Sequence, residues 1–427
     1  MPVEHKRWLI LPRWIMQTSH ALSPCTVPLP ECPSLGRSGV ALDEGIRSVV
    51  EAGFTGTKGT TMQPASIDFD PTIARSIASR VEQSHPGVDV ARDVAFSELW
   101  QFFKEARFLY PAKIARLEPV LAEVEKTVTA LLAANGTLMP TVVLRNQGLI
   151  EGHVCALRSH LRTWSIQHMA ARPLSARRVN ATAKLNLAIA SYGQFSPDVD
   201  WIRMCYRPDN PFPARVYGGF ARTVSDPLTS DLRQFHYLIA PTKTKPAEGR
   251  TAGFKVRCAE FADMPSIERW FLSRGRTVEL AANDLCGPEK FLQAIGLRFA
   301  AIGLTRRREI LVAERGSRIT GFALLEVSSL GMNFSELTNA FTIHMIESDS
   351  EGCLGLAQMA RQRYGQLGRE YCVALDEGAC IEGLESGGFV RMKVYECWTF
   401  HRCYIEQLAE HFRRTLVNRN KEALLCT

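Results

Sequence analysis

The stretch TVVLRNQGLIEGHV, residues 141–154, decides the fold because the chain contains a second version of it. Moved along by 169 residues, it falls on ILVAERGSRITGFA, residues 310–323. Both stretches place apolar residues on either side of a short polar turn, which is typical of two paired strands. Gly152 and Gly321 stand at the same place in the two stretches. The match predicts a strand hairpin that occurs once in each of two copies.

The same offset relates a second motif, far from the first. YGGFAR at residues 217–222 falls on SGGFVR at 386–391, and both contain Gly-Gly-Phe, one further residue and Arg. Between these motifs, ASYGQF at 190–195 resembles RQRYGQL at 361–367 with an offset of 172, so the second copy has a three-residue insertion. Two distant motifs with one offset indicate an internal duplication. We expect a tandem pair of domains.

The sequence patterns of both copies predict the same order of elements. This order favours an α/β domain built around a mixed sheet. An amphipathic helical region comes first, followed by the paired strands, a further strand and a helix. A strand and a helix then lead to a turn at Gly-Gly-Phe, and a last strand closes the unit. The helical region, further strand and helix are predicted at 96–117, 163–172 and 176–193 in the first copy, and at 264–275, 339–347 and 355–368 in the second.

Composition divides the chain further. The stretch APTKTKPAEGRTAG is rich in Pro, Thr, Lys and Gly, as expected of a linker between domains. The start of the chain is rich in Pro, Ser, Thr and Gly, which predicts a mostly irregular arm with a helix near 70–83. The predicted divisions are an arm at 1–90, domains at 91–240 and 254–403 with a linker at 241–253, and a helical tail at 404–427.

The bulk composition is that of an ordinary globular protein. Of the 427 residues, 46% are apolar and 22% are charged, and the net charge is +7. This charge allows an anionic ligand, but the basic runs are too short to indicate a nucleic-acid partner. The twelve cysteines include no CxxC pair, so we expect no metal site and free thiols in the cytoplasm. No apolar run reaches the length of a membrane span, so we expect no membrane partner.

The second copy begins with KVRCAEFADMPSIERWF, residues 255–271. This stretch resembles the first strand and first helix of the GNAT superfamily of N-acetyltransferases, whose patterns are "hRxA" and "xxDhxxIxxh", where h is hydrophobic. The strands ILVAERGSRITGFALL resemble the hairpin of that family, and Gly-Gly-Phe resembles its "LGF" turn. The resemblance covers about residues 253–402 and extends through the repeat to about 91–240. The residues that match the first pattern are Val256, Arg257, Ala259, Asp263, Met264 and Ile267.

This resemblance implies a transferase fold that binds an acyl-CoA, most often acetyl-CoA. Such domains transfer the acyl group to an amine on a small molecule, a peptide or a protein. Many tandem members keep a working site in one copy. We therefore expect an acyl-CoA-dependent N-acyltransferase with one active and one degenerate copy. The alternative is a catalytically inactive GNAT scaffold that binds a ligand or a partner and serves in regulation.

The family holds the pyrophosphate of CoA on a loop Q/R-x-x-G-x-G/A at the start of a helix, where backbone N–H groups favour anions. In the first copy the matching stretch is RRVNAT, with Asn and Thr at the small positions. In the second copy ESDSEGCLGLAQ has two glycines, but three acids would repel a phosphate. We expect the first copy to bind the cofactor, although Arg177 and Arg178 could also be a solvated helix start. The candidate cofactor-binding residues are Arg177, Arg178, Val179, Asn180, Ala181 and Thr182.

Transfer to an amine needs a base for the ammonium and an acid for the leaving thiolate. Family members often place a Tyr four residues before the glycine of the turn, but this chain has Arg215 and Leu384 there. Tyr217 is two residues out of place and is the candidate acid. His168 is the candidate base, and the alternative is a hydrogen-bonded core histidine.

The segment WIRMCYRPDNPFPARVYGGFAR is rich in aromatic residues and prolines, which favours a rigid wall for the acceptor. Tyr206 and Arg207 in this segment are candidate substrate-binding residues. Trp164, on the same predicted strand as His168, is a third candidate, although its side chain could instead pack within the sheet.

Overall fold

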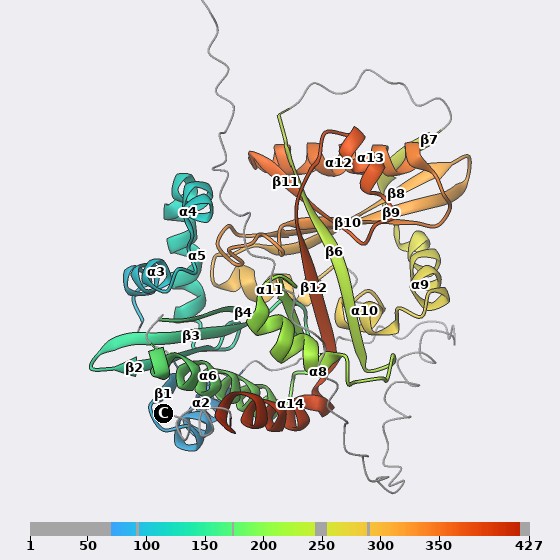
Figure 1. Ribbon diagram of the computed structural model, residues 1–427. Coiled ribbons are helices and arrows are strands. Elements are labelled where there is room, and N and C mark those ends of the chain that lie inside the picture. The colour runs from blue at the N-terminus through green and yellow to red at the C-terminus, as the bar shows by residue number, and fades with distance from the viewer. Residues whose placement is uncertain (1–69, 91–93, 173–174, 244–253, 288–290, 419–427) are drawn as a thin grey trace, which may run out of the picture. The chain divides into compact units, whose positions relative to one another are not determined.

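The computed structural model describes residues 70–90, 94–172, 175–243, 254–287 and 291–418, with 175–180 and 417–418 described by their backbone alone. All of these residues belong to one compact unit of the chain, which spans Lys58–Thr427. Within them, twelve strands form one mixed sheet in the order β1-β2-β3-β4-β5-β12-β6-β11-β10-β9-β8-β7 (Figure 1). The strands are β1 Val88–Val90, β2 Thr141–Asn146, β3 Leu149–Arg158, β4 Thr163–Ala171, β5 Trp201–Tyr206, β6 Ser230–Pro241, β7 Phe254–Cys258, β8 Arg306–Arg315, β9 Arg318–Ser328, β10 Ala340–Met345, β11 Tyr371–Asp376 and β12 Val390–His401.

The internal duplication is visible in the register of the two hairpins. In β2–β3, Leu144 pairs with Gly152 and the register then shifts at a bulge. In β8–β9, Ala313 pairs with Gly321 and the register shifts at the same step. Both pairs are related by the offset of 169 residues, so the copies share the irregularity as well as the strands. The predicted tandem α/β fold around a mixed sheet is confirmed.

The last strands of the two copies are exchanged. In each copy the fourth and fifth strands run parallel, as β4 with β5 and β10 with β11. The strand that follows does not close its own copy: β6 pairs with β11, and β12 pairs with β5. The two exchanged strands also pair with each other in the middle of the sheet (Figure 1). The sheet is therefore continuous through both copies, and the predicted domain boundaries stay a prediction.

Helices cover both faces of the sheet. The expected helix near residue 70 is present as α2, where the Asp70 side chain caps the first turn and Pro71 stands at its start. The helix predicted at 176–193 is α6. The longer helices are α2 Pro71–Ser84, α3 Phe96–Glu105, α4 Pro111–Leu117, α5 Leu121–Ala133, α6 Ser175–Phe195, α9 Met264–Ser273, α10 Thr277–Ala282, α11 Gln293–Ala301, α12 Ser350–Gln366, α13 Ile381–Ser386 and α14 Ile405–Phe412.

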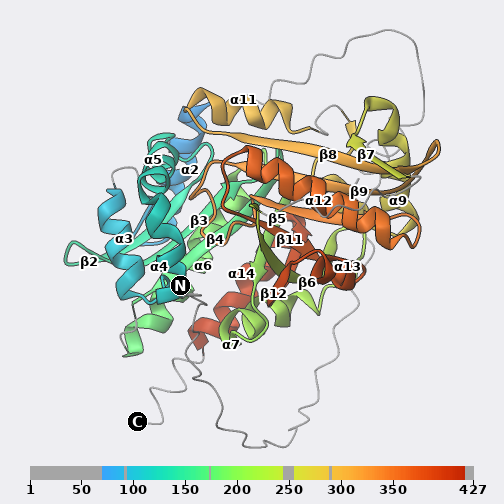
Figure 2. The same ribbon diagram turned by 90° about the horizontal axis from the view of Figure 1, so that it is seen from above.

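The first copy has a separate core on each face of its strands. Alternate residues of β2 point to opposite sides, with Val142 in one core and Val143 in the other. One core is covered by α2, α6 and α14, and the other by α3, α4 and α5 (Figure 1). Trp398 and Phe400 of β12 belong to the first of these cores. In the second copy, α12 lies along the strands (Figure 2) and packs on β8, β9 and β11.

The two Gly-Gly-Phe motifs differ in conformation. In the second copy the motif is a turn, with Gly388 at φ +86° after α13. In the first copy the predicted turn is wrong, because the motif lies in a helical run formed by α7 Pro211–Pro213, the π-helix η2 Ala214–Gly218 and α8 Gly219–Ala221. The Asn210 side chain caps this run by accepting from the N–H of Phe212, and Pro211 begins it. The helical conformation continues through both glycines.

Candidate functional site

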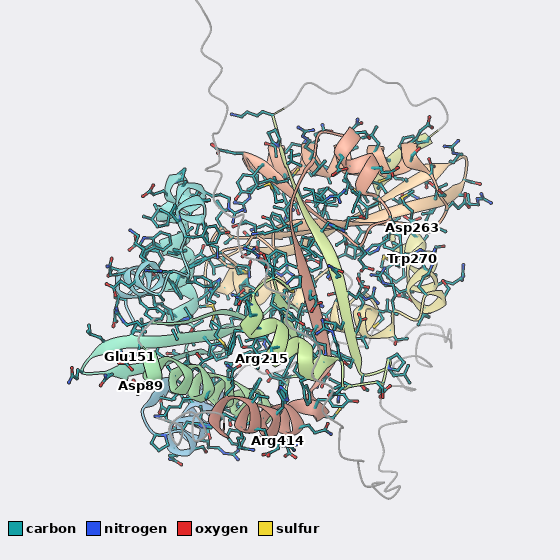
Figure 3. The ribbon with its side chains drawn as sticks, in the orientation of Figure 1. Asp89, Glu151, Arg215, Asp263, Trp270 and Arg414 are labelled. Atoms are coloured by element: carbon teal, nitrogen blue, oxygen red, sulfur yellow. The ribbon has the colours of Figure 1, made fainter. Side chains whose placement is uncertain are left out.

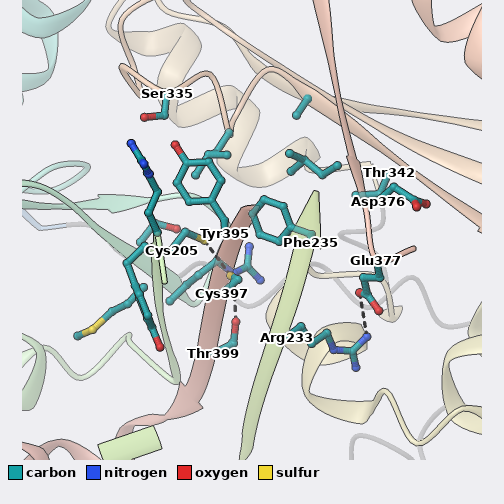
Figure 4. Close-up of a pocket in the computed structure, with 18 of the residues that line it drawn as sticks. Cys205, Arg233, Phe235, Ser335, Thr342, Asp376, Glu377, Tyr395, Cys397 and Thr399 are labelled. Atoms are coloured by element: carbon teal, nitrogen blue, oxygen red, sulfur yellow. Dashed lines mark hydrogen bonds and ion pairs between the residues drawn. The ribbon is translucent and has the colours of Figure 1, made fainter. Parts of the chain in front are cut away.

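A cavity of about 1600 Å³ lies at the middle of the sheet, where the two copies meet. Its walls come from β4 and β5 of the first copy, β10 and β11 of the second, and the exchanged strands β6 and β12. Figure 4 shows Phe235 of β6 and Tyr395 of β12 beside each other in this space, with Ser335 above them. The exchange of strands thus makes one cavity from both copies.

The cavity opens where β4 and β5 part. These parallel strands pair from Thr163 and Trp201 as far as Ile166 and Met204. Beyond that point β4 continues to Ala171, and its residues 167–171 line the cavity together with the end of β5. Backbone groups at such a splay have no neighbouring strand to pair with, so they can bind a ligand that lies between the strands.

Five of the sequence-predicted residues line this cavity: His168, Thr182, Tyr206, Arg207 and Tyr217. Trp164 does not join them, because it lies in the core with α6, where its ring packs on Tyr192 at 5.8 Å between centroids. Ala181 is buried in the same core. The side chains of Arg177, Arg178, Val179 and Asn180 lie outside the described residues.

The segment proposed for the pyrophosphate is helical. Because α6 begins at Ser175, RRVNAT forms part of its first two turns and is not a loop. Thr182 stands at the end of this segment, and its carbonyl oxygen accepts a hydrogen bond from the Asn186 side chain at 2.8 Å. The N-terminal turn of a helix presents free backbone N–H groups and the positive end of its dipole, which favour an anion.

In the second copy, the matching helix start belongs to α12 and is occupied by a carboxylate of the chain itself. Asp349 caps α12 and accepts from the N–H of Gly352 at 3.0 Å, while Arg315 lies 3.3 Å from the same carboxylate. Burial acts to raise the pKa of Asp349, but these two partners outweigh it and hold the pKa below its ordinary value. Gly355 serves packing, since a Cβ there would overlap the ring of Phe254. The negative charge at this helix start opposes a phosphate.

Tyr217 lies in the cavity wall with its hydroxyl fixed. The hydroxyl donates to Oδ1 of Asn186 on α6 at 2.8 Å and lies 3.0 Å from Sδ of Met169 on β4. Burial raises the pKa of Tyr217 well above its ordinary value. The phenol therefore stays protonated at neutral pH and cannot act there as a phenolate base. Arg215, labelled in Figure 3, lies two residues before Tyr217 in η2 and also lines the cavity.

His168 is held as a core histidine. Its Nε2 accepts from the backbone N–H of Phe334 at 3.2 Å, its ring stacks on the Phe334 ring at 4.2 Å, and its Nδ1 lies 3.7 Å from Sγ of Cys155. Burial lowers the pKa of His168 well below its ordinary value. The backbone is left-handed at φ +55°, at the point where β4 bulges away from β3. This geometry favours the structural interpretation of His168 over the catalytic one.

Tyr206 and Arg207 stand at the end of β5. Tyr206 is buried, and burial together with the nearby Glu396 carboxylate raises its pKa. Its ring lies 6.1 Å from the ring of Tyr217, so the two form one aromatic wall. Arg207 forms an ion pair with Asp209 and is about half exposed.

Sequence reasoning missed the polar groups that the strand exchange brings together in the cavity. Arg233 on β6 forms an ion pair with Glu377, as Figure 4 shows, and also pairs with the carboxylates of Asp231 and Glu279, so its charge is balanced. Cys205 and Cys397 face each other on β5 and β12. These residues lie far apart in the chain, and their local patterns carry no signal that the strand exchange joins them.

Sequence reasoning also missed Lys113 on α4, which lines the other side of the cavity. A signal was present, because Lys113 stands four residues after Leu109 and four before Leu117, on the apolar side of a helix. In the described part of the chain, no group of three or more metal-ligating side chains lies together. No helix there combines the length and the apolar composition that crossing a membrane requires.

Neither a protein-family model nor a curated protein matches the sequence. A tandem GNAT protein from the clavulanic acid biosynthesis pathway shares 13% identity with it, covering 65% of this chain and 88% of its own at a TM-score of 0.37. A GCN5-related N-acetyltransferase from Sphaerobacter thermophilus shares 12%, covering 61% and 80% at a TM-score of 0.37. A Drosophila protein shares 13%, covering 78% and 96% at 0.40. The similarity to these structures concerns the fold alone.

Proposed function

We propose that the chain is an acyl-CoA-dependent N-acyltransferase whose cofactor site lies in the first copy and whose second copy is degenerate. The observation that carries this proposal is the splay of β4 and β5, lined by one cavity from Thr182 to Tyr217. The GNAT-like sequence motifs give the chemistry for such a splay. Acetyl-CoA or a longer acyl-CoA supplies an activated thioester, and an amine is the acceptor.

The charges at the two helix starts support the choice of copy. The start of α12 holds Asp349, and its neighbours Glu347 and Glu351 bind Arg318 and Arg315. RRVNAT at the start of α6 contains two arginines and no acid. A pyrophosphate at α6 would therefore meet a helix N-terminus with added positive charge. At α12 the same group would have to displace a carboxylate.

The first copy offers a side chain that could protonate the leaving thiolate. Tyr217 holds its proton at neutral pH, and its hydroxyl projects from the cavity wall between α6 and β4. A protonated phenol at this place can donate to a thiolate as the acyl group departs. Because both nitrogens of His168 have partners, we place it as a residue that shapes the bulge of β4 rather than as the base.

A second candidate function is a binding or regulatory protein without catalysis. The hydrogen bonds of both predicted catalytic side chains favour it, since Tyr217 is tied to Asn186 and His168 to Phe334. Such a protein would bind a ligand in the same cavity and release no CoA.

A thermal-shift titration with acetyl-CoA and longer acyl-CoAs tests the proposal. A ligand at about 100 times its Kd adds about 2.7 kcal/mol to the free energy of unfolding. We expect a shift in the wild type that is lost in Arg177→Ala/Arg178→Ala. The matched control is Arg315→Ala/Arg318→Ala, which removes the same charge at the second copy and should keep the shift.

The opposite pattern, with the shift lost in the second pair alone, would place the cofactor at α12 and contradict the proposal. No shift with any acyl-CoA would favour the binding protein. Where a shift is found, release of CoA thiol with a panel of amines separates an enzyme from a CoA-binding protein.

A further inference from the structure

Lys113 is a buried cation in the wall of the cavity. Its side chain is only 6% exposed, and it projects from α4 toward the middle of the molecule. Its Nζ lies 4.1 Å from the centre of the Phe108 ring and 5.7 Å from that of Tyr110. No carboxylate of the described residues lies within ion-pair distance of this nitrogen. An ammonium buried against aromatic rings without a counter-ion is costly, so its position invites a ligand.

Further cations surround Lys113. Arg116 follows it on α4 and reaches the Tyr237 hydroxyl at 3.4 Å, and Lys393 of β12 lies over the same Tyr237 ring at 4.8 Å. Burial lowers the pKa of Lys113 to about 7, and the charges of Lys393 and Arg116 add to the effect. Burial likewise lowers the pKa of Lys393 to about 8, with Arg116 and Arg207 contributing.

Two acids lie near this cluster, and neither forms an ion pair with Lys113. Glu336 faces Arg116 but accepts from the Asn339 side chain at 2.8 Å, and burial raises its pKa. Asp209 pairs with the half-exposed Arg207. Tyr237 and Tyr395 also face the cluster, and both have raised pKa values, chiefly through burial, and stay neutral. Among the described residues, Lys113 itself therefore has no carboxylate partner.

We propose that the acceptor amine carries an anionic group, a carboxylate or a phosphate, that binds beside Lys113. This inference rests on the proposed acyl transfer and names the class of its acceptor. The walls add a second requirement, because Phe108, Leu337 and Tyr395 line the cavity near the cations. An acceptor with an aromatic or apolar body between its anionic group and its amine fits this lining.

The place of Lys113 separates this site from the pyrophosphate site. α4 packs in the core that lies on one face of the first copy's strands, and α6 packs in the core on the other face (Figure 1). β4 runs between them, and its residues 167–171 line the cavity. An anion at Lys113 thus reaches the splay from the face opposite to α6, which suits an acceptor that attacks a thioester held on the α6 side.

Calorimetric binding of three probes of similar size tests the inference without any acyl-CoA. The probes are phenylpropanoate, phenyl phosphate and phenylpropylamine, and the first two distinguish a carboxylate from a phosphate. We expect at least one anion to bind the wild type and the amine alone not to bind. Lys113→Met should weaken the binding of that anion by about tenfold or more. Lys126→Met, which changes an exposed lysine on α5, is the matched control and should bind as the wild type does.

The affinity should also depend on pH in one direction. The anion binds the protonated Lys113, so raising the pH above about 7 must weaken binding in the wild type, by up to about tenfold per pH unit. Binding near pH 8 should take up a proton from the buffer. Lys113→Arg keeps its charge at every pH, and its affinity should change much less over the same range.

Anion binding that is unchanged in Lys113→Met, a preference for phenylpropylamine, or no binding by either anion would overturn the inference. So would an acetyl-CoA shift that Lys113→Met abolishes, because the cations would then hold the cofactor. The two proposals can fail separately. If acetyl-CoA gives no shift while phenylpropanoate still binds through Lys113, the acyl transfer fails and an anion site remains; far-UV circular dichroism confirms that each variant is folded.

Discussion

Gly219 and Gly388 are equivalent residues of the two copies, yet their backbones are of opposite hand. Gly388 has φ +86°, and Gly219 has φ −59°. After α13 the N–H of Phe389 donates to the carbonyl of Leu384, and the N–H of Gly388 donates to that of Glu385. This is the bonding of a Schellman cap, which needs a left-handed residue at the position of Gly388. In the first copy the helix runs on, and one repeated motif has two conformations.

Alanine at these two glycines should therefore have opposite effects. Gly388→Ala forces a left-handed alanine, which costs about 1–2 kcal/mol of the free energy of unfolding. Gly219→Ala places alanine in a helix, where its Cβ meets no atom within 4 Å, and should stabilise by roughly 0.5–1 kcal/mol. Urea unfolding measures both variants. Equal effects of the two changes would show that the motif has the same conformation in both copies.

The strand exchange predicts that the two copies cannot be pulled apart by cutting the chain between them. Residues 244–253 of the predicted linker 241–253 lie outside the described residues, and a protease site inserted there leaves β6 and β12 intact. β12 joins the sheet of the first copy, and β6 joins that of the second. We expect the two cut pieces to elute as one complex in size-exclusion chromatography. Two separately folded pieces would contradict the exchange.

Trp398 offers a direct test of the same arrangement. It belongs to β12 but is fully buried in a core of the first copy, stacked on Phe400 at 4.0 Å and 5.7 Å from Phe220. Trp398→Ala should cost about 3–5 kcal/mol of the free energy of unfolding. In the cut chain it should also release the two pieces from each other. If the two pieces stay together at the same concentration, β12 contributes less to their association than the loss of the buried indole predicts.

Replacing Tyr217 separates catalysis from binding. Tyr217→Phe keeps the ring in the wall and removes the proton that the phenol would donate, so we expect kcat to fall by about 100-fold with little change in KM. Tyr404→Phe removes a hydroxyl that contacts Thr229 outside the cavity lining, and serves as the control. A rise in KM without a change in kcat would show that Tyr217 contributes to substrate binding. The acid would then remain unidentified.

The local pattern of the chain was enough to predict the hairpins and α6. Polar turns between apolar runs define β2–β3 and β8–β9, and a repeated offset relates them without any knowledge of contacts. The local pattern does not predict the strand with which a last strand pairs. β6 and β12 have the alternating pattern of any strand, and that pattern does not say which neighbour each will pair with. The exchange, and with it the shared cavity, could not be predicted from the sequence.

The candidate site was predicted in part for a related physical reason. Tyr206 and Arg207 reach the cavity because they stand at the end of β5, and Tyr217 reaches it from the helical run that follows that strand. Trp164 could not be assigned to a face in the same way. The bulge at His168 interrupts the alternation of β4, so residues before and after it no longer follow one period of two.

Four histidines whose pKa is lowered make the stability of the protein sensitive to acid. His153, His160 and His344 are buried in the folded state and His168 is half-buried, and loss of hydration lowers the pKa of each, to about 4 for His153 and about 3 for His344. The unfolded chain protonates them near pH 6.5, while the folded chain does not. The folded state is therefore favoured above pH 6.5, and each histidine costs up to about 1.4 kcal/mol per pH unit below it.

Comparing one variant with the wild type isolates this effect from that of the carboxylates. His344 packs among Trp270, Phe271 and Phe322, so His344→Phe fills the same space without a group that titrates. Urea unfolding at about pH 7.5, 6 and 5 should show the wild type losing stability faster than His344→Phe as the pH falls. Because the carboxylates are common to both proteins, their contribution cancels in the difference. Equal slopes, or a wild type that gains stability on acidification, would mean that His344 takes up its proton in the folded state, and that its aromatic surroundings do not keep it neutral.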